Sequence, residues 1–181
     1  MRIISGQYKG RRITAPKKLP VRPTTDMAKE GLFNILNNSF YFDEISVLDL
    51  FAGTGNISYE FASRGAEHII CVDAHYGCIK FIDQIATQLE ANITAIKSDV
   101  FSYLEKTQKK HDIIFADPPY ALPEEDFSKI SHWVFKNQLL KEEGVLIIEH
   151  SKHTDLSHLD YFSSSRKYGG SVFSFFSIST D

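Results

Sequence analysis

The residues Asp117-Pro118-Pro119-Tyr120 place hydrogen-bond acceptors beside an aromatic ring, directly after the apolar run 112–116. The run is typical of a buried strand, and the two prolines then fix the backbone in a bend. The Asp117 carboxylate is an acceptor, and Pro118 offers only an acceptor because proline has a carbonyl oxygen but no N–H. Paired acceptors suit a planar amine with two hydrogens, and a nucleobase can stack on the Tyr120 ring. We therefore predict a catalytic motif made of Asp117, Pro118, Pro119 and Tyr120.

The exocyclic amine of a nucleobase is a weak nucleophile, because its lone pair is delocalised into the ring. Hydrogen bonds from both of its N–H groups to Asp117 and the Pro118 carbonyl would favour a pyramidal nitrogen. They would also stabilise the positive charge that develops on nitrogen as a group is transferred to it. The base must leave its stack to enter such a pocket. The bend therefore predicts group transfer to the amine of an extruded base.

Acidic residues occur at the ends of four apolar runs. If these runs are parallel strands, their carboxyl ends meet at one edge of the sheet, which is where α/β sheets bind ligands. We therefore expect four carboxylates to converge on one rim. The acids are Asp49, Asp73, Asp99 and Asp117, and the runs are 45–50, 68–72, 93–97 and 112–116.

The glycines Gly53 and Gly55 open the helix expected after the first run. Asp73 follows Gly55 by 18 residues, close to the spacing of a dinucleotide-binding fingerprint, but the third glycine position holds Ser58. A rim of carboxylates would also repel a pyrophosphate. S-adenosylmethionine fits better, because it presents a sulfonium, an ammonium group, a ribose diol and an exocyclic amine, and no phosphate. Each hydrogen bond between such groups and a charged partner contributes roughly 1.5–3 kcal/mol.

We therefore predict S-adenosylmethionine as the cofactor. Asp73 is expected to bind the ribose hydroxyls and Asp99 the adenine amine, while Asp49 lies near the methionine end. Gly53 and Gly55 would allow the backbone to approach the cofactor closely.

From residue 45 onward, strand-like runs alternate with helical patterns. This alternation predicts right-handed crossovers and a mostly parallel, doubly wound α/β sheet. Tyr168-Gly169-Gly170 interrupts the alternation, and its flanking runs predict an antiparallel hairpin that closes the sheet. The expected strands are 45–50, 68–72, 93–97, 112–116, 144–150, 160–167 and 171–179, and the expected helices are 53–64, 77–90, 101–106 and 124–136.

The N-terminal region differs from the rest of the chain in charge. Residues 1–29 hold eight basic residues and one acid, a charge of +7, so the net charge of −3 leaves −10 for the remainder. We interpret 1–23 as an extended basic arm that contacts phosphate, with a short hairpin as one option, and 24–181 as a single domain. The domain is expected to begin with a helix that Thr24 or Thr25 caps.

Other features favour a cytoplasmic protein without a metal. The N-terminus lacks the apolar segment of a secretory signal, and no apolar run is long enough to span a membrane. The two cysteines suit a reducing compartment. His150 and His153 leave a predicted strand without a nearby third ligand, so we interpret them as loop residues and predict no metal site.

Five segments together resemble the bacterial small-subunit rRNA guanine-N2 methyltransferases, the family that modifies guanine 966 of 16S rRNA. DPPY looks like the motif of amino-methyltransferases, and the glycine segment looks like their cofactor loop. The segments are GQYKGRRI at 6–13, RPTTDMAKEGLFNIL at 22–36, LDLFAGTGNISYEFASRGA at 48–66, DPPY at 117–120 and YGGSVFSFFSI at 168–178.

The resemblance implies a Rossmann-like class I methyltransferase fold with a seven-stranded, mostly parallel sheet. It implies S-adenosylmethionine as the methyl donor, N2-methylguanine as the product, and 16S rRNA within a 30S subunit or assembly intermediate as the partner. The expected cofactor contacts are Thr25, Asp49, Phe51, Gly53, Thr54, Gly55, Asp73, Asp99 and Val100, and the expected substrate contacts are Lys9, Arg11, Arg12, Arg22 and Thr24.

The chain departs from the family where members often carry arginines, at Met27 and Lys29. A two-pronged phosphate contact is not expected there, because lysine acts as a point charge. Two alternatives stay open. One is an adenine-N6 DNA methyltransferase with the same Pro-Pro bend, although 181 residues leave no room for a target-recognition domain. The other is a non-catalytic RNA-binding assembly factor that would not bind the cofactor.

Overall fold

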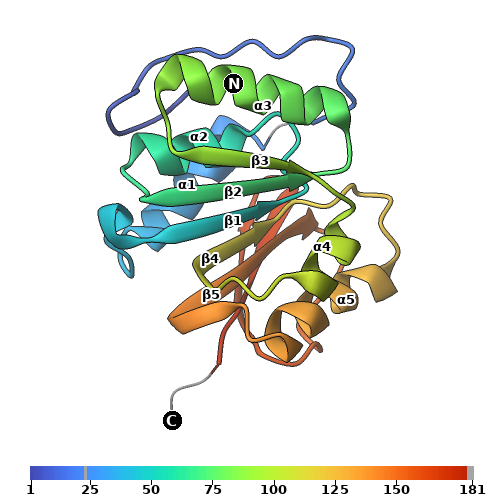
Figure 1. The fold of residues 1–181 in the computed structure, drawn as a ribbon. Coiled ribbons are helices and arrows are strands. Elements are labelled where there is room, and N and C mark those ends of the chain that lie inside the picture. Colours follow the sequence, from blue (N-terminus) through green and yellow to red (C-terminus); the bar gives the residue numbers. More distant parts are fainter. Residues whose placement is uncertain (23, 179–181) are drawn as a thin grey trace.

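The computed structural model describes residues 1–22 and 24–178, which form one seven-stranded sheet with helices on both faces (Figure 1). The strand order is β3-β2-β1-β4-β5-β7-β6. Neighbouring strands are parallel except at β7, which runs antiparallel to both β5 and β6. The predicted α/β fold and closing hairpin are confirmed. The strands are β1 Ser46–Leu50, β2 His68–Asp73, β3 Ile93–Lys97, β4 His111–Ala116, β5 Leu140–Ser151, β6 Phe162–Tyr168 and β7 Ser171–Phe176.

The helices divide between the two faces of the sheet. One face is covered by α1 (Asp26–Leu36), α2 (Asn56–Ser63) and α3 (Tyr76–Leu89). The other is covered by α4 (Val100–Lys106) and α5 (Glu124–Lys136). Both faces of the central strands are therefore buried, which explains why their sequences read as continuous apolar runs.

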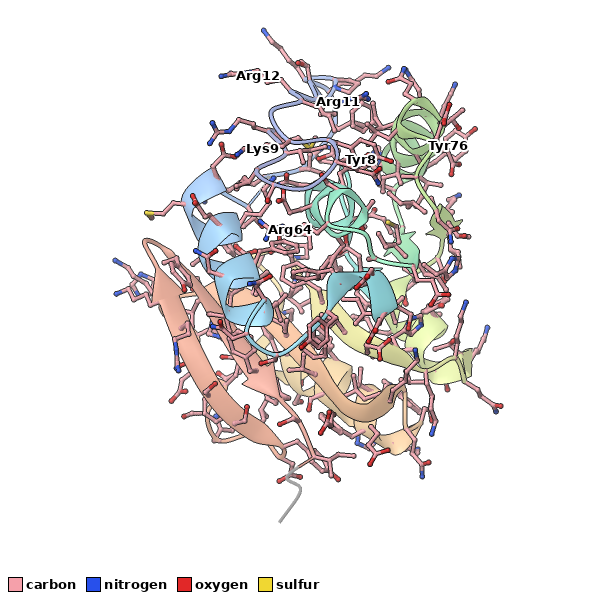
Figure 2. The ribbon with its side chains drawn as sticks, turned by 90° about the vertical axis from the view of Figure 1, so that its left-hand side faces the viewer. Tyr8, Lys9, Arg11, Arg12, Arg64 and Tyr76 are labelled. Carbon is pink, nitrogen blue, oxygen red and sulfur yellow. The ribbon has the colours of Figure 1, made fainter. Side chains whose placement is uncertain are left out.

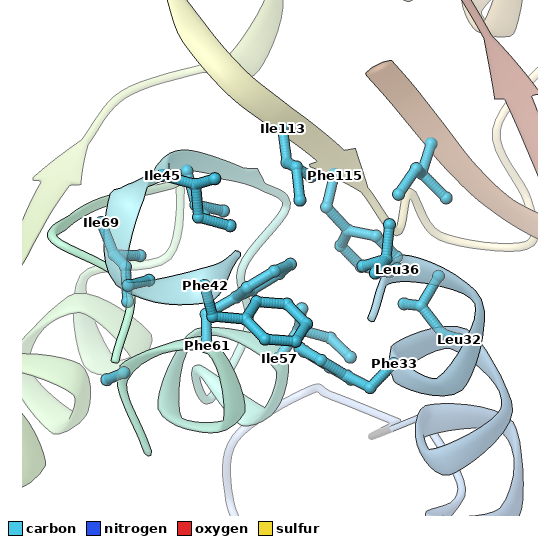
Figure 3. Packing of buried hydrophobic residues seen from close by; sticks show 14 of the residues in the cluster. Leu32, Phe33, Leu36, Phe42, Ile45, Ile57, Phe61, Ile69, Ile113 and Phe115 are labelled. Carbon is cyan, nitrogen blue, oxygen red and sulfur yellow. The ribbon is translucent and has the colours of Figure 1, made fainter. Parts of the chain in front are cut away.

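Aromatic rings fill the core between α1, α2 and the sheet (Figure 3). The Phe33 and Phe61 ring centres lie 4.6 Å apart in an edge-on arrangement. The Arg64 guanidinium lies 4.6 Å from the Phe33 ring centre, so a charged group closes the outer side of this cluster. Full burial of each ring contributes about 1.5–3 kcal/mol. The cluster fixes α1 and α2 relative to β1 and β4, the strands that lead to the predicted bend.

Helix α1 is capped by Thr25, which resolves the choice that the sequence left open. Thr25 has extended backbone angles, and its hydroxyl accepts a hydrogen bond from the Ala28 N–H at 3.2 Å. Thr24 is thereby left outside the cap, and its side chain turns to other partners.

Several boundaries differ from the sequence predictions. Helix α2 begins at Asn56 rather than at Gly53, because Gly53 and Gly55 have φ values of 55° and 82° that a right-handed helix excludes. Strand β5 begins at Leu140 rather than at residue 144. Leu140 pairs with His111 of β4, and a register shift follows between His111 and Ile113. The expected strand 171–179 ends at Phe176, and its last predicted residue lies outside the described residues.

Residues 1–22 lie against α2 and α3 rather than extending into solvent (Figure 2). Ile3 and Ile13 are buried among apolar residues of both helices. A bridge between Arg2 and Arg12 makes the segment a short hairpin. The hairpin option of the sequence analysis thus applies to this segment. Pro23, the last residue of the predicted arm, lies outside the described residues.

Within the described residues, every helix is too short or too polar to cross a lipid bilayer.

Candidate active site

A cleft of about 540 Å³ opens at the carboxyl ends of strands β1 to β5 and is closed on one side by the segment before α1. This volume is in the range of small-molecule sites. All four acids predicted to converge line it, as do Pro118, Pro119 and Tyr120. The other predicted residues that line it are Arg22, Thr24, Thr25, Phe51, Gly53, Thr54 and Val100.

Asp117 and Pro118 are held at the end of β4 by the central strands. The Asp117 N–H donates to the Leu50 carbonyl at 3.3 Å, which extends the β1–β4 pairing into the bend. Pro118 is buried, whereas Tyr120 is 49% exposed and its ring centre lies 5.3 Å from the Arg22 guanidinium. The bend thus presents acceptors inside the cleft and an aromatic face at its mouth.

Burial raises the pKa of Asp117 well above its ordinary value, and the negative charges of Glu149 and Asp49 raise it further. The Arg22 guanidinium acts in the opposite direction. Asp117 is therefore an electron-rich acceptor in a poorly solvated site, where a hydrogen bond from a substrate amine is strengthened.

Glu149 is a fifth acid in the cleft, and the sequence analysis missed it. It follows Ile148 of β5, which pairs with Ala116 of β4, so Glu149 lies beside the position of Asp117 directly after β4. Glu149 is only 3% exposed, and its Oε2 accepts a hydrogen bond from the Thr24 hydroxyl at 2.7 Å. The available signal was an acid directly after the apolar run at 145–148, the same pattern that identified the other four.

Asp49 lies inside β1 and is almost fully buried. Its Oδ2 accepts a hydrogen bond from the Ser58 hydroxyl at 2.6 Å. Burial raises the pKa of Asp49 to about 7, although the Ser58 hydroxyl lowers it. At the third glycine position of the dinucleotide fingerprint, the Ser58 side chain thus provides a hydrogen-bond donor to the Asp49 carboxylate, which glycine could not do.

Asp73 and Asp99 each organise the backbone that surrounds them. Asp73 accepts hydrogen bonds from the Gly53 N–H at 2.9 Å and from the His75 N–H at 2.8 Å. Asp99 is the N-cap of α4 and accepts from the Ser102 N–H at 2.9 Å. Because a carboxylate oxygen can accept two hydrogen bonds, both side chains keep acceptor capacity toward the cleft.

Gly55 is absent from the lining residues, unlike Gly53. It has a φ of 82°, and a Cβ at this position would lie 2.7 Å from the Tyr59 ring. Glycine is therefore required at residue 55 by the turn into α2 and by the packing of Tyr59, rather than by an approach to the cleft.

The predicted substrate residues fall into two groups. Arg22 and Thr24 line the cleft, whereas Lys9, Arg11 and Arg12 are exposed on the loop of the N-terminal segment (Figure 2). That loop contacts the C-terminal end of α2, while the cleft lies at the N-terminal end of the same helix. The structure does not bring the second group to the cleft.

Lys29, one of the two departures from the family pattern, is fully buried and holds three segments together. Its Nζ donates to the Arg2 carbonyl at 2.6 Å and to Asn56 Oδ1 at 2.9 Å, and lies 3.5 Å from Glu60 Oε2. Burial lowers the pKa of Lys29, and the Glu60 charge counteracts this. Residue 29 therefore faces the interior and is not placed to contact a phosphate.

Asn56 connects this buried cluster to the cleft, which it lines. Its side-chain amide donates to the Thr24 carbonyl at 3.0 Å, and Thr24 in turn donates to Glu149. A continuous set of hydrogen bonds thus links Lys29 to the acid beside the bend.

The cleft fits a cationic ligand that carries a ribose and no phosphate. Its lining includes five carboxylates, and Arg22 is the one lysine or arginine among its described residues. The acids are spread along the cleft, and the described residues contain no group of three or more histidine, cysteine or acidic side chains arranged to hold a metal ion.

Comparison with known proteins relates this chain to a family and to named rRNA methyltransferases. Residues 1–177 match the family described as conserved hypothetical protein 95. The chain is 36% identical over 161 residues to "Putative rRNA methyltransferase YlbH" of Bacillus subtilis, covering 86% of this chain and 85% of that protein. It is 32% identical over 152 residues to ribosomal RNA small subunit methyltransferase D of Escherichia coli, covering 82% and 74% of the two chains.

A solved structure shares the fold over nearly the whole chain. "Putative methyltransferase yhhF" from Escherichia coli superposes with a TM-score of 0.83 at 27% identity, covering 97% of this chain and 96% of that one. The family match over residues 1–177 includes both the residues that line the cleft and the segment before α1 that closes it on one side. The chain therefore belongs to the conserved hypothetical protein 95 family, whose members above are named as methyltransferases.

Proposed function

We propose that this chain is an S-adenosylmethionine-dependent methyltransferase that modifies the N2 amine of guanine 966 in 16S rRNA. The observation that carries the proposal is the pair of acceptors at Asp117 and Pro118, which opens into a cleft lined with carboxylates. The names of the relatives as rRNA and small-subunit rRNA methyltransferases support an rRNA substrate.

The cofactor site is formed by the loop after β1 and the ends of β2 and β3. Asp73 would accept hydrogen bonds from the ribose hydroxyls, and Asp99 and Val100 would face the adenine. Asp49 would face the amino-acid end, and Thr25, Phe51, Gly53 and Thr54 would complete the walls. S-adenosylmethionine supplies an electrophilic methyl group on a positively charged sulfur.

The protein's own residues prepare the base amine for this methyl group. Tyr120 would stack on the extruded guanine, an interaction that contributes about 1–3 kcal/mol. Asp117 and the Pro118 carbonyl would accept one hydrogen bond each from the N2 amine, which localises its lone pair and stabilises developing positive charge. Asp117 is also placed to receive the proton that the nitrogen loses. Because the motif lies at strand ends, its geometry is fixed before the base arrives.

The exposed basic residues of the N-terminal segment would contact rRNA outside the cleft. Lys9, Arg11 and Arg12 are solvent-exposed and belong to the positively charged N-terminal region of a chain that is otherwise acidic. Arg22, at the mouth, would meet a phosphate next to the target base. The substrate would be a 30S subunit or an assembly intermediate in the cytoplasm.

The test is methyl transfer to 30S subunits purified from a strain that lacks this protein. Tritiated S-adenosylmethionine should label 16S rRNA, and mass mapping should place N2-methylguanosine at position 966. The same assay with duplex DNA should give no label on adenine. DNA labelling, or no binding of the cofactor by isothermal titration, would replace the proposal with one of the two alternative functions.

A further inference from the structure

Glu149 lies beside the methyl-accepting bend, and no step of the proposed reaction uses it. Side chains of a strand alternate between faces, so Ile147 and Glu149 share one face of β5. Phe115 of β4 and Asp117, the residue directly after β4, share the corresponding face. Ile147 and Phe115 both pack in the core beneath α1 and α2. Asp117 and Glu149 therefore project from adjacent strands on the same side of the sheet, at the α1 wall of the cleft.

The hydrogen bond from Thr24 decides what Glu149 can offer a ligand. Because the Thr24 hydroxyl donates to Oε2, one acceptor position of this oxygen is already used. None of the ion pairs among the described residues includes Glu149. Besides Thr24, the Ser171 side chain and the charge of Arg22 stabilise the carboxylate. A carboxylate has about four acceptor positions, so Glu149 can still accept a hydrogen bond from a bound substrate in the cleft that it lines.

The edge of guanine has the donors that this arrangement needs. Its N2 amine and the adjacent N1–H point in the same direction, whereas adenine has a lone pair at N1. With Asp117 and the Pro118 carbonyl on the N2 amine, the next donor along the edge is N1–H. We propose that Glu149 is a specificity-determining residue that accepts the guanine N1–H and excludes bases with an acceptor at N1. This inference rests on the proposed function.

A buried acceptor gives strong discrimination, because a base with an unprotonated N1 would place its lone pair against the carboxylate and leave both groups unpaired. Asn56 and Thr24 then act as positioning residues. The Asn56 amide holds the Thr24 carbonyl, and the Thr24 hydroxyl holds Glu149.

The test compares three ribonucleosides that differ at these two atoms. 2-Aminopurine riboside also lacks the O6 of guanosine and inosine, a difference that the Glu149 variant below leaves unchanged. Guanosine has both N1–H and the N2 amine, inosine has only N1–H, and 2-aminopurine riboside has the amine but no N1–H. Their dissociation constants are measured by isothermal titration with protein saturated with S-adenosylhomocysteine. We expect the wild type to bind guanosine at least tenfold more tightly than 2-aminopurine riboside, and to bind inosine more tightly than 2-aminopurine riboside.

Glu149→Gln should reverse part of this preference. A glutamine amide can donate to an unprotonated N1, so the ratio of the guanosine and 2-aminopurine riboside affinities should fall by about tenfold or more. The control is Glu142→Gln, an exposed acid on the same strand, which should leave the ratio unchanged. A role of Glu149 in stability alone would lower the affinity for all three nucleosides equally.

Two results would overturn the inference: equal affinity of the wild type for guanosine and 2-aminopurine riboside, or an unchanged ratio in Glu149→Gln. Both can occur in a protein that still forms N2-methylguanosine in 16S rRNA. Failure of that methylation in the wild type would instead contradict the proposed function, so the two failures are distinguishable.

Discussion

At the scale of single residues, the site is a group of carboxylates whose surroundings give each a different task. Asp73 and Asp99 accept backbone N–H bonds and shape the loops. Asp49 is buried beside Ser58, and Asp117 and Glu149 share a poorly solvated wall with a single nearby cation, Arg22. Burial sets the last three acids apart, because desolvation penalises the charged forms of Asp49, Asp117 and Glu149 and raises their pKa values.

Asp117→Ala should reduce the rate of methyl transfer by about 10²-fold or more, because the amine loses its charged acceptor in the transition state. Cofactor affinity should stay unchanged, since the bend serves the substrate. The rate is measured with 30S subunits and the affinity by isothermal titration. An equal loss of cofactor binding would contradict this division of roles.

The rate should fall at low pH in a range above the ordinary titration of aspartate. Burial first, and then the charge of Glu149, raise the pKa of Asp117, and its protonation removes the acceptor. Glu149→Gln removes one of these negative charges, so the acid limb of its residual turnover should move to lower pH. The pH profile of kcat tests this, with Glu142→Gln as the control. A limb that stays in place in Glu149→Gln would show that the two acids do not interact.

At the scale of elements, the N-terminal hairpin is bound to α2 by hydrogen bonds to the side chain of one residue, Glu60. The Glu60 carboxylate is fully buried and accepts hydrogen bonds from the Ile4 and Ser5 N–H groups at 2.9 and 3.0 Å. It also meets Arg64 Nε at 3.0 Å and Lys29. The hairpin precedes Arg22 and Thr24 in the chain, so we expect its docking to help position one wall of the cleft.

Two glycines of this hairpin provide a matched test of the docking. Gly6 and Gly10 have φ values of 85° and 83°, so alanine is strained at either position, by about 1 kcal/mol. A Cβ at Gly6 would lie 1.8 Å from the Ser63 carbonyl oxygen of α2, whereas nothing lies within 4 Å of one at Gly10. We expect Gly6→Ala to lower the free energy of unfolding by a further 1–3 kcal/mol or so relative to Gly10→Ala.

Urea unfolding of both variants measures the difference. Equal effects of the two substitutions would mean that the hairpin does not stay docked on α2 in solution.

At the scale of the whole molecule, charge is separated between the N-terminal segment and the body. Replacing Lys9, Arg11 and Arg12 with glutamate should weaken binding to 16S rRNA without changing turnover at saturation, because these residues lie outside the cleft. The slope of log affinity against log salt should flatten by about one unit for each lost phosphate contact. Glutamate at Lys106, Lys109 and Lys110, which are equally exposed, is the control. An unchanged salt slope would mean that the RNA does not contact Lys9, Arg11 and Arg12.

Stability of the whole molecule should depend on pH through His111, a fully buried residue at the start of β4. Burial lowers the pKa of His111 to about 4. The unfolded chain therefore binds the extra proton between about pH 6.5 and 4, so the stability contribution of this residue is complete above pH 6.5 and is lost as the pH falls. The loss amounts to at most about 3 kcal/mol.

His111→Leu should remove this part of the pH dependence. The comparison is the change in Tm between pH 7 and pH 5 in the wild type and the variant. The same change in both proteins would contradict the assignment to His111.

The sequence by itself determined the alternating elements, the closing hairpin and the rim of four acids. These follow from local patterns: apolar runs specify buried strands, and the residues directly after parallel strands must meet at one edge of the sheet. The bend at Asp117 was readable for the same reason, because proline restricts its own backbone whatever surrounds it.

Only the tertiary structure decided the roles of Glu149, Lys29 and Gly55. Glu149 faces Asp117 because of the β4–β5 register, and Lys29 is buried because the N-terminal hairpin covers it. Gly55 is required by the ring of Tyr59. Each depends on contacts between segments that pattern alone does not pair, since long-range packing sets burial, and burial sets whether a charged side chain faces solvent, a partner or a ligand.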